Sequence, residues 1–243
     1  MLIQADLHTH TIASTHAYST ITENCTYAAQ IGLKCIAMTD HAMMMPDSPH
    51  IWHFGNLSVL PRKISDVCVL KGAEVNIYNY NGDIDIEEKR ICQLEWVVAS
   101  YHRYMFPDFK PADPKTVTDG YMKLFENPHV DVIGHPTTTN FPVDWERFVR
   151  AAKEYGKLIE LNESSIRTGK SPNENVTEML MQCKKYDAPI TVDSDAHFWN
   201  SIGHAPLAEK ILDEIDFPKR LVVNADWEEL REMILKKRPN LDI

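Results

Sequence analysis

Pairs of metal-ligand side chains occur in this sequence at a spacing of two residues. The segments DLHTH at 6–10 and DSDAH at 193–197 each end a run of apolar residues. In an extended chain, residues two apart face the same side, so each segment presents two ligand-type side chains together. These pairs are His8 with His10 and Asp195 with His197. Both pairs predict a metal site.

The wider placement of the histidines makes this prediction more specific. With eleven histidines in 243 residues, chance alone supplies roughly half an H-x-H pattern, and a single histidine after a strand is more often structural. Seven of the eleven, however, follow predicted strands, and two acidic residues hold equivalent positions. The nine candidate ligands are His8, His10, His16, His41, Glu74, His102, His135, Asp195 and His197.

Nine ligands exceed the needs of two metal ions. A catalytic zinc ion typically takes three protein ligands plus water, and a carboxylate such as Glu74 can bridge two ions. We therefore expect three divalent transition-metal ions, and we assign Glu74 and Asp195, the two carboxylates of the set, to catalysis. Seven imidazoles without a thiolate suit Zn²⁺, with Mn²⁺ or Fe²⁺ as alternatives, and they disfavour an all-oxygen Mg²⁺ site.

Parallel strands joined by helices are predicted to position these residues. Seven short β-branched and apolar runs recur along the chain, each able to form a buried strand. They are Ile3–His8, Cys35–Asp40, Cys68–Val75, Trp96–His102, Val130–His135, Leu158–Asn162 and Ile190–Asp195. Alternating strands and helices imply β-α-β units whose carboxyl ends gather functional groups at one rim. We expect an α/β barrel or strongly curved sheet, in which only the run at 158–162 ends without an obvious ligand.

Helix signals lie between most of these runs. Thr20 with Glu23 forms a capping-box pattern before a helix that stops near Gly32. The segment SPNE at 171–174 indicates a second helix, with Ser171 as its N-cap. Asp113 and Asp144 begin two more, the latter ending near Gly156.

The remaining segments are less regular. Residues 51–64 predict only a short helix, and the proline-rich residues 107–114 predict a long loop. Leu221–Asn224 is a candidate for a short eighth strand before a closing helix at Trp227–Lys237. With no domain boundary evident, we expect one domain over residues 1–243.

Composition excludes several functional classes. The 25 basic and 35 acidic residues give a formal charge of −10, which argues against gripping long nucleic acid or an anionic membrane. No apolar run approaches the roughly 18 residues that span a bilayer, and the N-terminus lacks signal-peptide features. The five cysteines form no C-x-x-C pair and indicate reduced, mostly buried thiols in a cytoplasmic protein.

The sequence resembles the PHP (polymerase and histidinol phosphatase) superfamily. The motifs that carry the resemblance are, in order, Asp6-x-His8-x-His10, Thr39-Asp40-His41, Glu74, His102, Gly134-His135 and Asp195-x-His197. The similarity looks closest to YcdX-like stand-alone phosphatases and extends to residues 13–19, 50–54 and 213–218. It implies a distorted (β/α)₇ TIM-like barrel with a trinuclear site, in which the nine candidates are the ligands and Glu74 bridges.

Together, the ligands and the resemblance predict a phosphatase that acts on small phosphate monoesters. Three divalent ions and two carboxylates leave roughly +4 in the pocket, which attracts a phosphate dianion. A metal-activated hydroxide would attack phosphorus in line. Arg103 and Arg167 follow strands and are candidates to grip the phosphate, although a surface role is equally compatible.

Other residues near these motifs have two interpretations each. Asp6, Asp40 and Asp193 lie next to ligands and either orient imidazoles or cap strand-end loops. The loop at 43–53 either forms a pocket wall or packs locally, the latter being more common for Met and aromatic residues. His129 and His204 are assigned to the surface, with His204 close enough in sequence to approach a substrate.

Three alternatives remain. An amidohydrolase also uses H-x-H, but it normally bridges metals through a strand-end lysine, where this sequence has His102. A non-catalytic, metal-stabilised domain is disfavoured by the intact ligand set. A phosphodiesterase or nuclease is the main competitor, because the same metals cleave diesters; the acidic charge favours monoesters. Homo-oligomerisation is compatible with the sequence.

Overall fold

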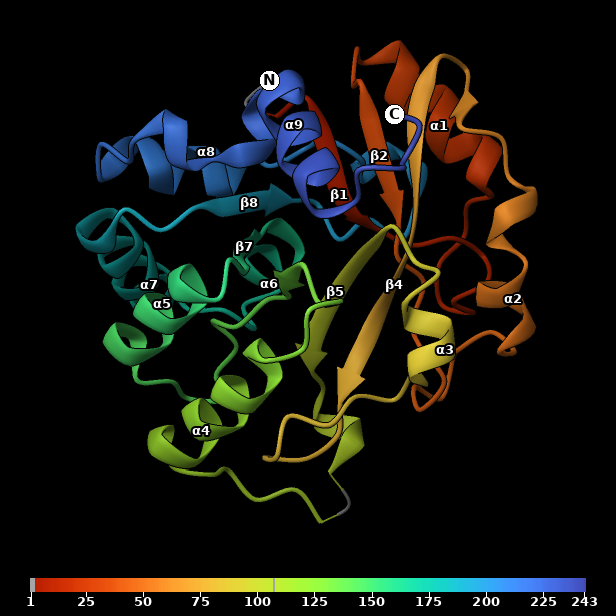
Figure 1. Ribbon diagram of the computed structural model, residues 1–243. Coiled ribbons are helices and arrows are strands. Elements are labelled where there is room, and N and C mark those ends of the chain that lie inside the picture. The colour runs from red at the N-terminus through yellow and green to blue at the C-terminus, as the bar shows by residue number, and fades with distance from the viewer. Residues whose placement is uncertain (1–2, 107) are drawn as a thin grey trace.

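A computed structural model describes residues 3–106 and 108–243. Seven parallel strands form a nearly closed barrel in the order β1-β2-β4-β5-β6-β7-β8 (Figure 1). Their bounds are β1 Ala5–Thr9, β2 Cys35–Met38, β4 Val67–Ile77, β5 Trp96–Tyr101, β6 Val132–Ile133, β7 Leu158–Asn162 and β8 Ile190–Asp193. Each run predicted as a strand overlaps an observed strand, and the distorted (β/α)₇ fold is confirmed.

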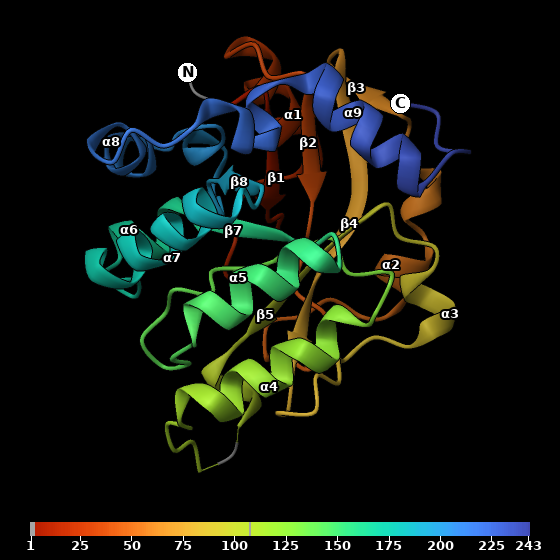
Figure 2. The ribbon, with the colours of Figure 1, turned by 60° about the vertical axis from the view of Figure 1, so that its left-hand side comes forward.

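Helices surround the barrel and follow the predicted caps closely. They are α1 Ile21–Gln30, α2 Trp52–Gly55, α3 Glu88–Ile91, α4 Pro114–Phe125, α5 Trp145–Glu154, α6 Glu163–Arg167, α7 Asn173–Tyr186, α8 Pro206–Glu214 and α9 Trp227–Lys237. The Thr20–Glu23 capping box is present, and Asp113 and Asp144 cap α4 and α5. Figure 2 shows α4, α5 and α7 side by side along the outer face of the barrel.

One cap prediction is wrong. Helix α7 begins at Asn173 with Pro172, not Ser171, at the N-cap position. The Ser171 hydroxyl instead accepts a hydrogen bond from Thr137 Oγ1 at 2.8 Å. A contact with a distant loop therefore replaces the local cap. The loop prediction at 107–114 holds from Asp108 to Asp113, and its first residue, Pro107, lies outside the described residues.

Strand β4 changes its neighbour halfway along its length. Residues 68–71 pair with β2, and residues 72–77 pair with β5. Gly72 lies at the change, and a Cβ there would lie 2.4 Å from the carbonyl oxygen of Trp96. The absence of a side chain lets the two strands approach closely, which carries Glu74 and Asn76 into the end of the barrel. A short strand, β3 Lys63–Ile64, pairs antiparallel with the start of β4.

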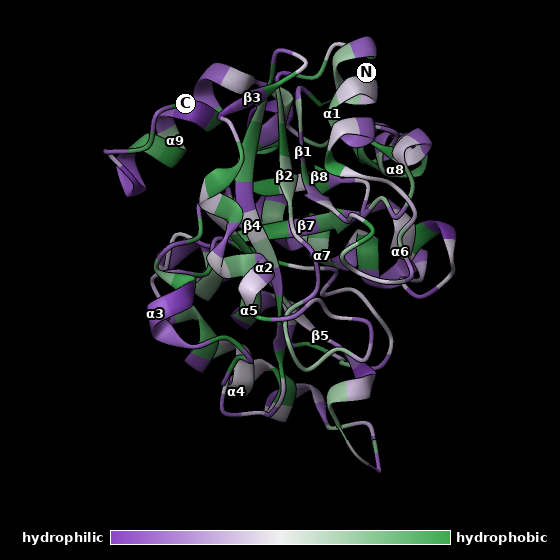
Figure 3. Cartoon of the chain, turned by 90° about the vertical axis from the view of Figure 1, so that its right-hand side faces the viewer, coloured by the Kyte–Doolittle hydropathy of each residue, from purple (hydrophilic) through white to green (hydrophobic). Residues whose placement is uncertain are grey.

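Two apolar clusters hold these layers together. The larger lies between the strands and the outer helices, and the smaller joins alternate strand residues such as Leu7, Leu70 and Trp96 to Leu230 and Ile234 of α9. In Figure 3 the strands are mostly green, and several surrounding helices carry both green and purple residues. Helix α9 thus closes the barrel at the end where the strands begin (Figure 1). No helix among the described residues is long and apolar enough to cross a membrane.

The expected eighth strand at Leu221–Asn224 is absent. That segment forms two 3₁₀ turns, η4 Lys219–Leu221 and η5 Val223–Ala225, and only Val222 makes a parallel bridge, to Ile190. The buried Asn224 side chain supplies the missing hydrogen bonds. Its Nδ2 donates to the carbonyl oxygens of Ala5 and Val192, and its Oδ1 accepts from the Val192 amide. One side chain therefore joins β1 to β8.

We expect Asn224→Ala to destabilise the protein. The substitution leaves three buried backbone groups without the side chain that now pairs with them, each costing about 1–3 kcal/mol, so a loss of at least about 3 kcal/mol in the free energy of unfolding is expected. Urea unfolding of the metal-free protein measures it. Asn240→Ala is the matched control, because Asn240 is exposed; equal stability of the two variants would contradict the joining role.

Candidate metal centre

The nine predicted ligands converge where the barrel strands end. His8 lies in β1 and Glu74 in β4. The others follow strands: His10 after β1, His41 after β2, His102 after β5, His135 after β6, and Asp195 and His197 after β8. His16 lies at the edge of the cluster, in the loop before α1, with 52% of its side chain exposed. The structure brings the set together, and the assignment of each member as a ligand stays a prediction.

Glu74 lies at the centre of the cluster. Its Oε2 faces the imidazole nitrogens of three histidines, at 2.9 Å from His41 Nδ1, 3.4 Å from His8 Nε2 and 3.6 Å from His10 Nε2. Its Oε1 faces two others, at 3.0 Å from His135 Nε2 and 3.3 Å from His102 Nε2. The two oxygens thus face different groups of imidazoles, as a bridging carboxylate would.

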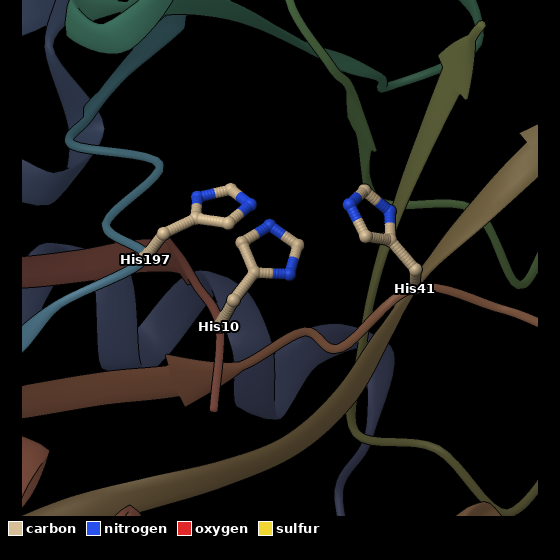
Figure 4. Close-up of side chains that lie close together, drawn as sticks. All are labelled: His10, His41 and His197. Carbon is tan, nitrogen blue, oxygen red and sulfur yellow. The ribbon is translucent and has the colours of Figure 1, made fainter. Parts of the chain in front are cut away.

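The imidazoles of His10, His41 and His197 also face one another (Figure 4). Their ligand nitrogens lie within 4.8 Å of one another, as do the ligand atoms of three further sets. These sets are His8 with His10 and Glu74, His41 with Glu74 and His102, and His16 with His41 and Asp47.

Within the described part of the chain, five buried imidazole nitrogens of this cluster form no hydrogen bond, although carboxylate oxygens lie near several of them. Nε2 of His8, both ring nitrogens of His10, Nδ1 of His41 and Nε2 of His197 are buried without a hydrogen bond among the described residues. Buried polar atoms normally have a partner. A group of imidazole nitrogens around a carboxylate is the donor set that transition metals prefer, so these residues fit such ions.

The charge states of Glu74 and His10 suit metal binding. Burial alone would raise the pKa of Glu74, but the neighbouring His8 and His102 help to hold that pKa well below its usual value. Burial, followed by the charge of His41, lowers the pKa of His10 to about 3. An ionised carboxylate and a neutral imidazole are the forms that bind metal.

Two cluster residues hold unusual backbone conformations. His135 has φ 29° and Asp195 has φ 51°, in the region that non-glycine residues rarely adopt. Asp195 Oδ1 lies 3.2 Å from His10 Nε2 and 3.5 Å from His197 Nδ1. Such strain persists only where the surroundings enforce it, and it gathers at functional sites.

Glu160 of β7 is a site residue that the sequence analysis missed. It is fully buried, its Oε1 lies 2.7 Å from His8 Nδ1, and its Oε2 accepts the His135 backbone amide at 2.6 Å. Oε2 also accepts from Asn162, whose Nδ2 reaches Asp195 Oδ2 at 3.3 Å. Strand β7 therefore contributes a carboxylate that positions site residues of three other segments.

Asn76 has a similar role on the other side of the cluster. Its Oδ1 lies 2.7 Å from His102 Nδ1, while its Nδ2 donates to Asp85 Oδ2 at 2.6 Å. Asp85 in turn accepts the backbone amides of Asn76 and Met44. This chain of hydrogen bonds fixes the ring of His102. Asn76, which begins the chain, lies two residues after Glu74 in β4.

Asp47 is the third residue that the sequence analysis missed. Its Oδ2 lies 2.7 Å from Nδ1 of the exposed His16. The loop after β2 thus holds the ring of His16 beside His41, with ring centroids 5.5 Å apart. Asp47 belongs to the loop at 43–53, of which Met45, Pro46 and Asp47 line the pocket over the cluster while Trp52 lies outside it.

The aspartates adjacent to the predicted ligands cap loops. Asp6 accepts from Ser194 and from the backbone amide of Gly203. Asp193 accepts the amide of Leu7. Asp40 accepts from both donor groups of Thr11 and from Ser14 Oγ, and it lies 3.2 Å from His53 Nε2. Of the two interpretations, loop capping is therefore the one that the structure shows.

A pocket of about 640 Å³ opens above the cluster. Its lining includes Glu74, His102, Asp195 and, among the described residues, two cations, Arg103 and Lys170. Arg103 lies where a phosphate-binding residue is expected, and its contact with phosphate stays a prediction. Arg167, at the end of α6, is not part of the lining. His129 and His204 pair with Glu88 and Tyr27 away from the pocket, in agreement with their surface assignment.

A nearly closed α/β barrel with imidazoles and carboxylates gathered at its carboxyl rim defines a metal-binding barrel protein of the hydrolase type. The PHP domain family matches residues 6–166. The chain belongs to the PHP domain family.

Curated relatives are similar to this chain in sequence, and a solved structure is similar to it in fold. A protein from Clostridium novyi named "Probable phosphatase" is 42% identical over 96% of this chain and 94% of its own. A "Probable phosphatase" from Acetivibrio thermocellus is 41% identical over 99% of both chains. The crystal structure of histidinol phosphate phosphatase from Lactococcus lactis, in complex with zinc, L-histidinol and phosphate, has a TM-score of 0.58 at 16% identity and covers 98% of this chain and 94% of that one.

Proposed function

We propose that this protein is a metal-dependent phosphatase that hydrolyses small phosphate monoesters. The observation that carries the proposal is the group of imidazoles around Glu74 at the base of a 640 Å³ pocket. The names of the curated relatives, which match this chain almost end to end, support phosphatase chemistry. The pocket has a size suited to a small molecule.

We further propose that the site holds three metal ions. The nine candidate ligands would hold them, with Asp47 as a further donor beside His16. Zn²⁺ suits an imidazole-rich set, and the Lactococcus lactis phosphatase contains zinc. When bound, such ions supply Lewis acidity and lower the pKa of water to near neutrality.

The chain's own residues bind and orient the reactants. Glu74 and Asp195 supply the negative charge that holds cations in the cluster, and we propose these two as the catalytic carboxylates. Glu160 fixes the ring of His8, and Asn76 fixes that of His102. Arg103 lines the pocket and offers a guanidinium to a phosphate oxygen.

We expect two to three equivalents of transition metal per chain in protein purified without chelator, because the ligand sets share Glu74. Elemental analysis measures this. A reproducible value below one would contradict a multinuclear site.

Hydrolysis of monoesters is expected to exceed that of diesters, because the net charge of −10 disfavours a polynucleotide. Kinetics on phenyl phosphate, on bis-phenyl phosphate and on single-stranded DNA test this directly. Faster cleavage of the diester or of DNA would favour the competing function, a metal-dependent phosphodiesterase or nuclease.

The setting of this activity is also part of the proposal. We place the activity in the cytoplasm and in a single domain over residues 1–243. This proposal is compatible with a homo-oligomer. All five cysteines are free thiols, and four of them are buried. This agrees with a reducing compartment.

A further inference from the structure

A set of polar side chains lies beside the metal cluster on one wall of the same pocket. Thr138, Thr139 and Asn140 belong to the loop after β6, and Lys170 belongs to the turn before α7. We call these four residues the polar wall. Within residues 3–106 and 108–243, their side chains form no hydrogen bond or ion pair.

Buried contacts hold the polar wall in place from behind. Thr137 Oγ1 donates to Ser171 Oγ at 2.8 Å, and both residues are 2% exposed. Asn175 Nδ2 donates to the carbonyl oxygen of Thr137 at 3.0 Å. The backbone amide of Thr139 donates to the carbonyl oxygen of Lys170 at 3.2 Å. Two loops far apart in the sequence are thereby joined, and the unpaired groups are left facing the pocket.

The chemistry of the polar wall suits a particular kind of leaving group. Threonine hydroxyls and an asparagine amide both donate and accept hydrogen bonds, which matches the hydroxyls of a sugar or polyol. Lys170 adds a cation that makes no ion pair with Glu74 or Asp195. Because the phosphate that reacts has to reach the cluster around Glu74, the Lys170 ammonium is available to a second anion.

We propose that the substrate is a phosphate monoester whose leaving group is polyhydroxylated and carries a second anionic group, bound by the polar wall with the second anion on Lys170. This rests on the proposed phosphatase function. The second anion is a carboxylate or a second phosphate, which share the chemistry that Lys170 recognises.

Matched substrates test the proposal on the zinc-loaded enzyme. Glucose 6-phosphate and 6-phosphogluconate differ by a carboxylate, fructose 6-phosphate and fructose 1,6-bisphosphate differ by a phosphate, and phenyl phosphate lacks hydroxyls. We expect kcat/KM to rise from phenyl phosphate to the sugar phosphates, and by about a further 10-fold for one of the doubly anionic members.

Lys170→Met is expected to bring the ratio of kcat/KM between that doubly anionic substrate and its partner close to one, mainly through KM. Lys123→Met, at an exposed lysine of α4, is the matched control and should leave the ratio unchanged. Asn140→Ala is a second variant, expected to reduce the preference for sugar phosphates over phenyl phosphate.

The possible results distinguish a failure of the substrate inference from a failure of the proposed phosphatase function. Hydrolysis of all substrates with no preference for a second anion, or a ratio unaffected by Lys170→Met, would overturn this inference and leave the phosphatase function standing. If the metal-loaded protein hydrolyses none of the monoesters, the phosphatase function fails and the inference fails with it.

Discussion

Glu74→Gln is expected to reduce turnover by more than about 100-fold and to release at least one metal ion per chain, since ligand changes typically cost 10–100-fold and a bridging ligand more. Each oxygen of Glu74 faces a different group of imidazoles, within 3.6 Å. Glutamine keeps the shape but replaces one oxygen with an NH₂ group, which cannot bind a cation. The measurements are metal content and kcat on folded protein.

Two further variants serve as comparisons for Glu74→Gln: His16→Ala and Glu126→Gln. His16 is half exposed and lies at the edge of the cluster, so its alanine variant is expected to lose one metal and keep residual turnover. Glu126 is exposed at the end of α4, so Glu126→Gln should behave as the unmodified protein. Full metal content in Glu74→Gln would mean that Glu74 is not the bridge.

Glu160→Gln is expected to weaken metal retention and activity by about 10–100-fold, although Glu160 is not a predicted ligand. Oε2 accepts the backbone N–H of His135, and Oε1 faces His8 Nδ1, which carries the proton when Nε2 binds metal. Both positions therefore need an acceptor. A glutamine side chain offers one acceptor and one donor group. Its NH₂ group would therefore face either the His135 amide or the protonated His8 Nδ1, each of which is also a donor.

Competition with a chelator separates this positioning role from a general loss of stability. We expect the half-time of metal loss to shorten in Glu160→Gln at a temperature where circular dichroism shows the fold intact. Glu126→Gln again serves as the control. Retention equal to that of the unmodified protein would show that the ring of His8 needs no carboxylate behind it.

The barrel and the cluster could be predicted because both depend on local patterns. A predicted ligand lies within or soon after the apolar run at each of the strands β1, β2, β4, β5, β6 and β8, and parallel strands end at one rim. Caps such as Thr20 and Asp144 involve residues only three apart, so the sequence alone displays them. The turn between β3 and β4 was not predictable, because Ser65 and Asp66 adopt positive φ without the glycine or asparagine that usually marks such a hairpin.

The residues behind the predicted ligands were missed because their partners are distant in sequence. Glu160 lies inside an apolar strand, two residues before its end, and His8 is the partner that explains it. Glu163, which directly follows this strand, accepts the backbone amides of Leu207 and Ala208 at the start of α8 and takes no part in the cluster. The usable signal was a carboxylate inside a buried strand, since such a group has to be paired.

The junction between β1 and β8 gives the candidate metal centre a further significance. A backbone bridge between Thr9 and Ala196 joins the ends of the two strands. Elsewhere side chains join them, through Asn224 and through Asp193, which accepts the amide of Leu7. His8 and His10 stand on one side of this junction, and Asp195 and His197 stand on the other. Ions shared between them would act as a reversible cross-link between the first and last strands, closing a loop that contains most of the chain. Occupancy of the site would then govern the mechanical integrity of the barrel as well as its chemistry.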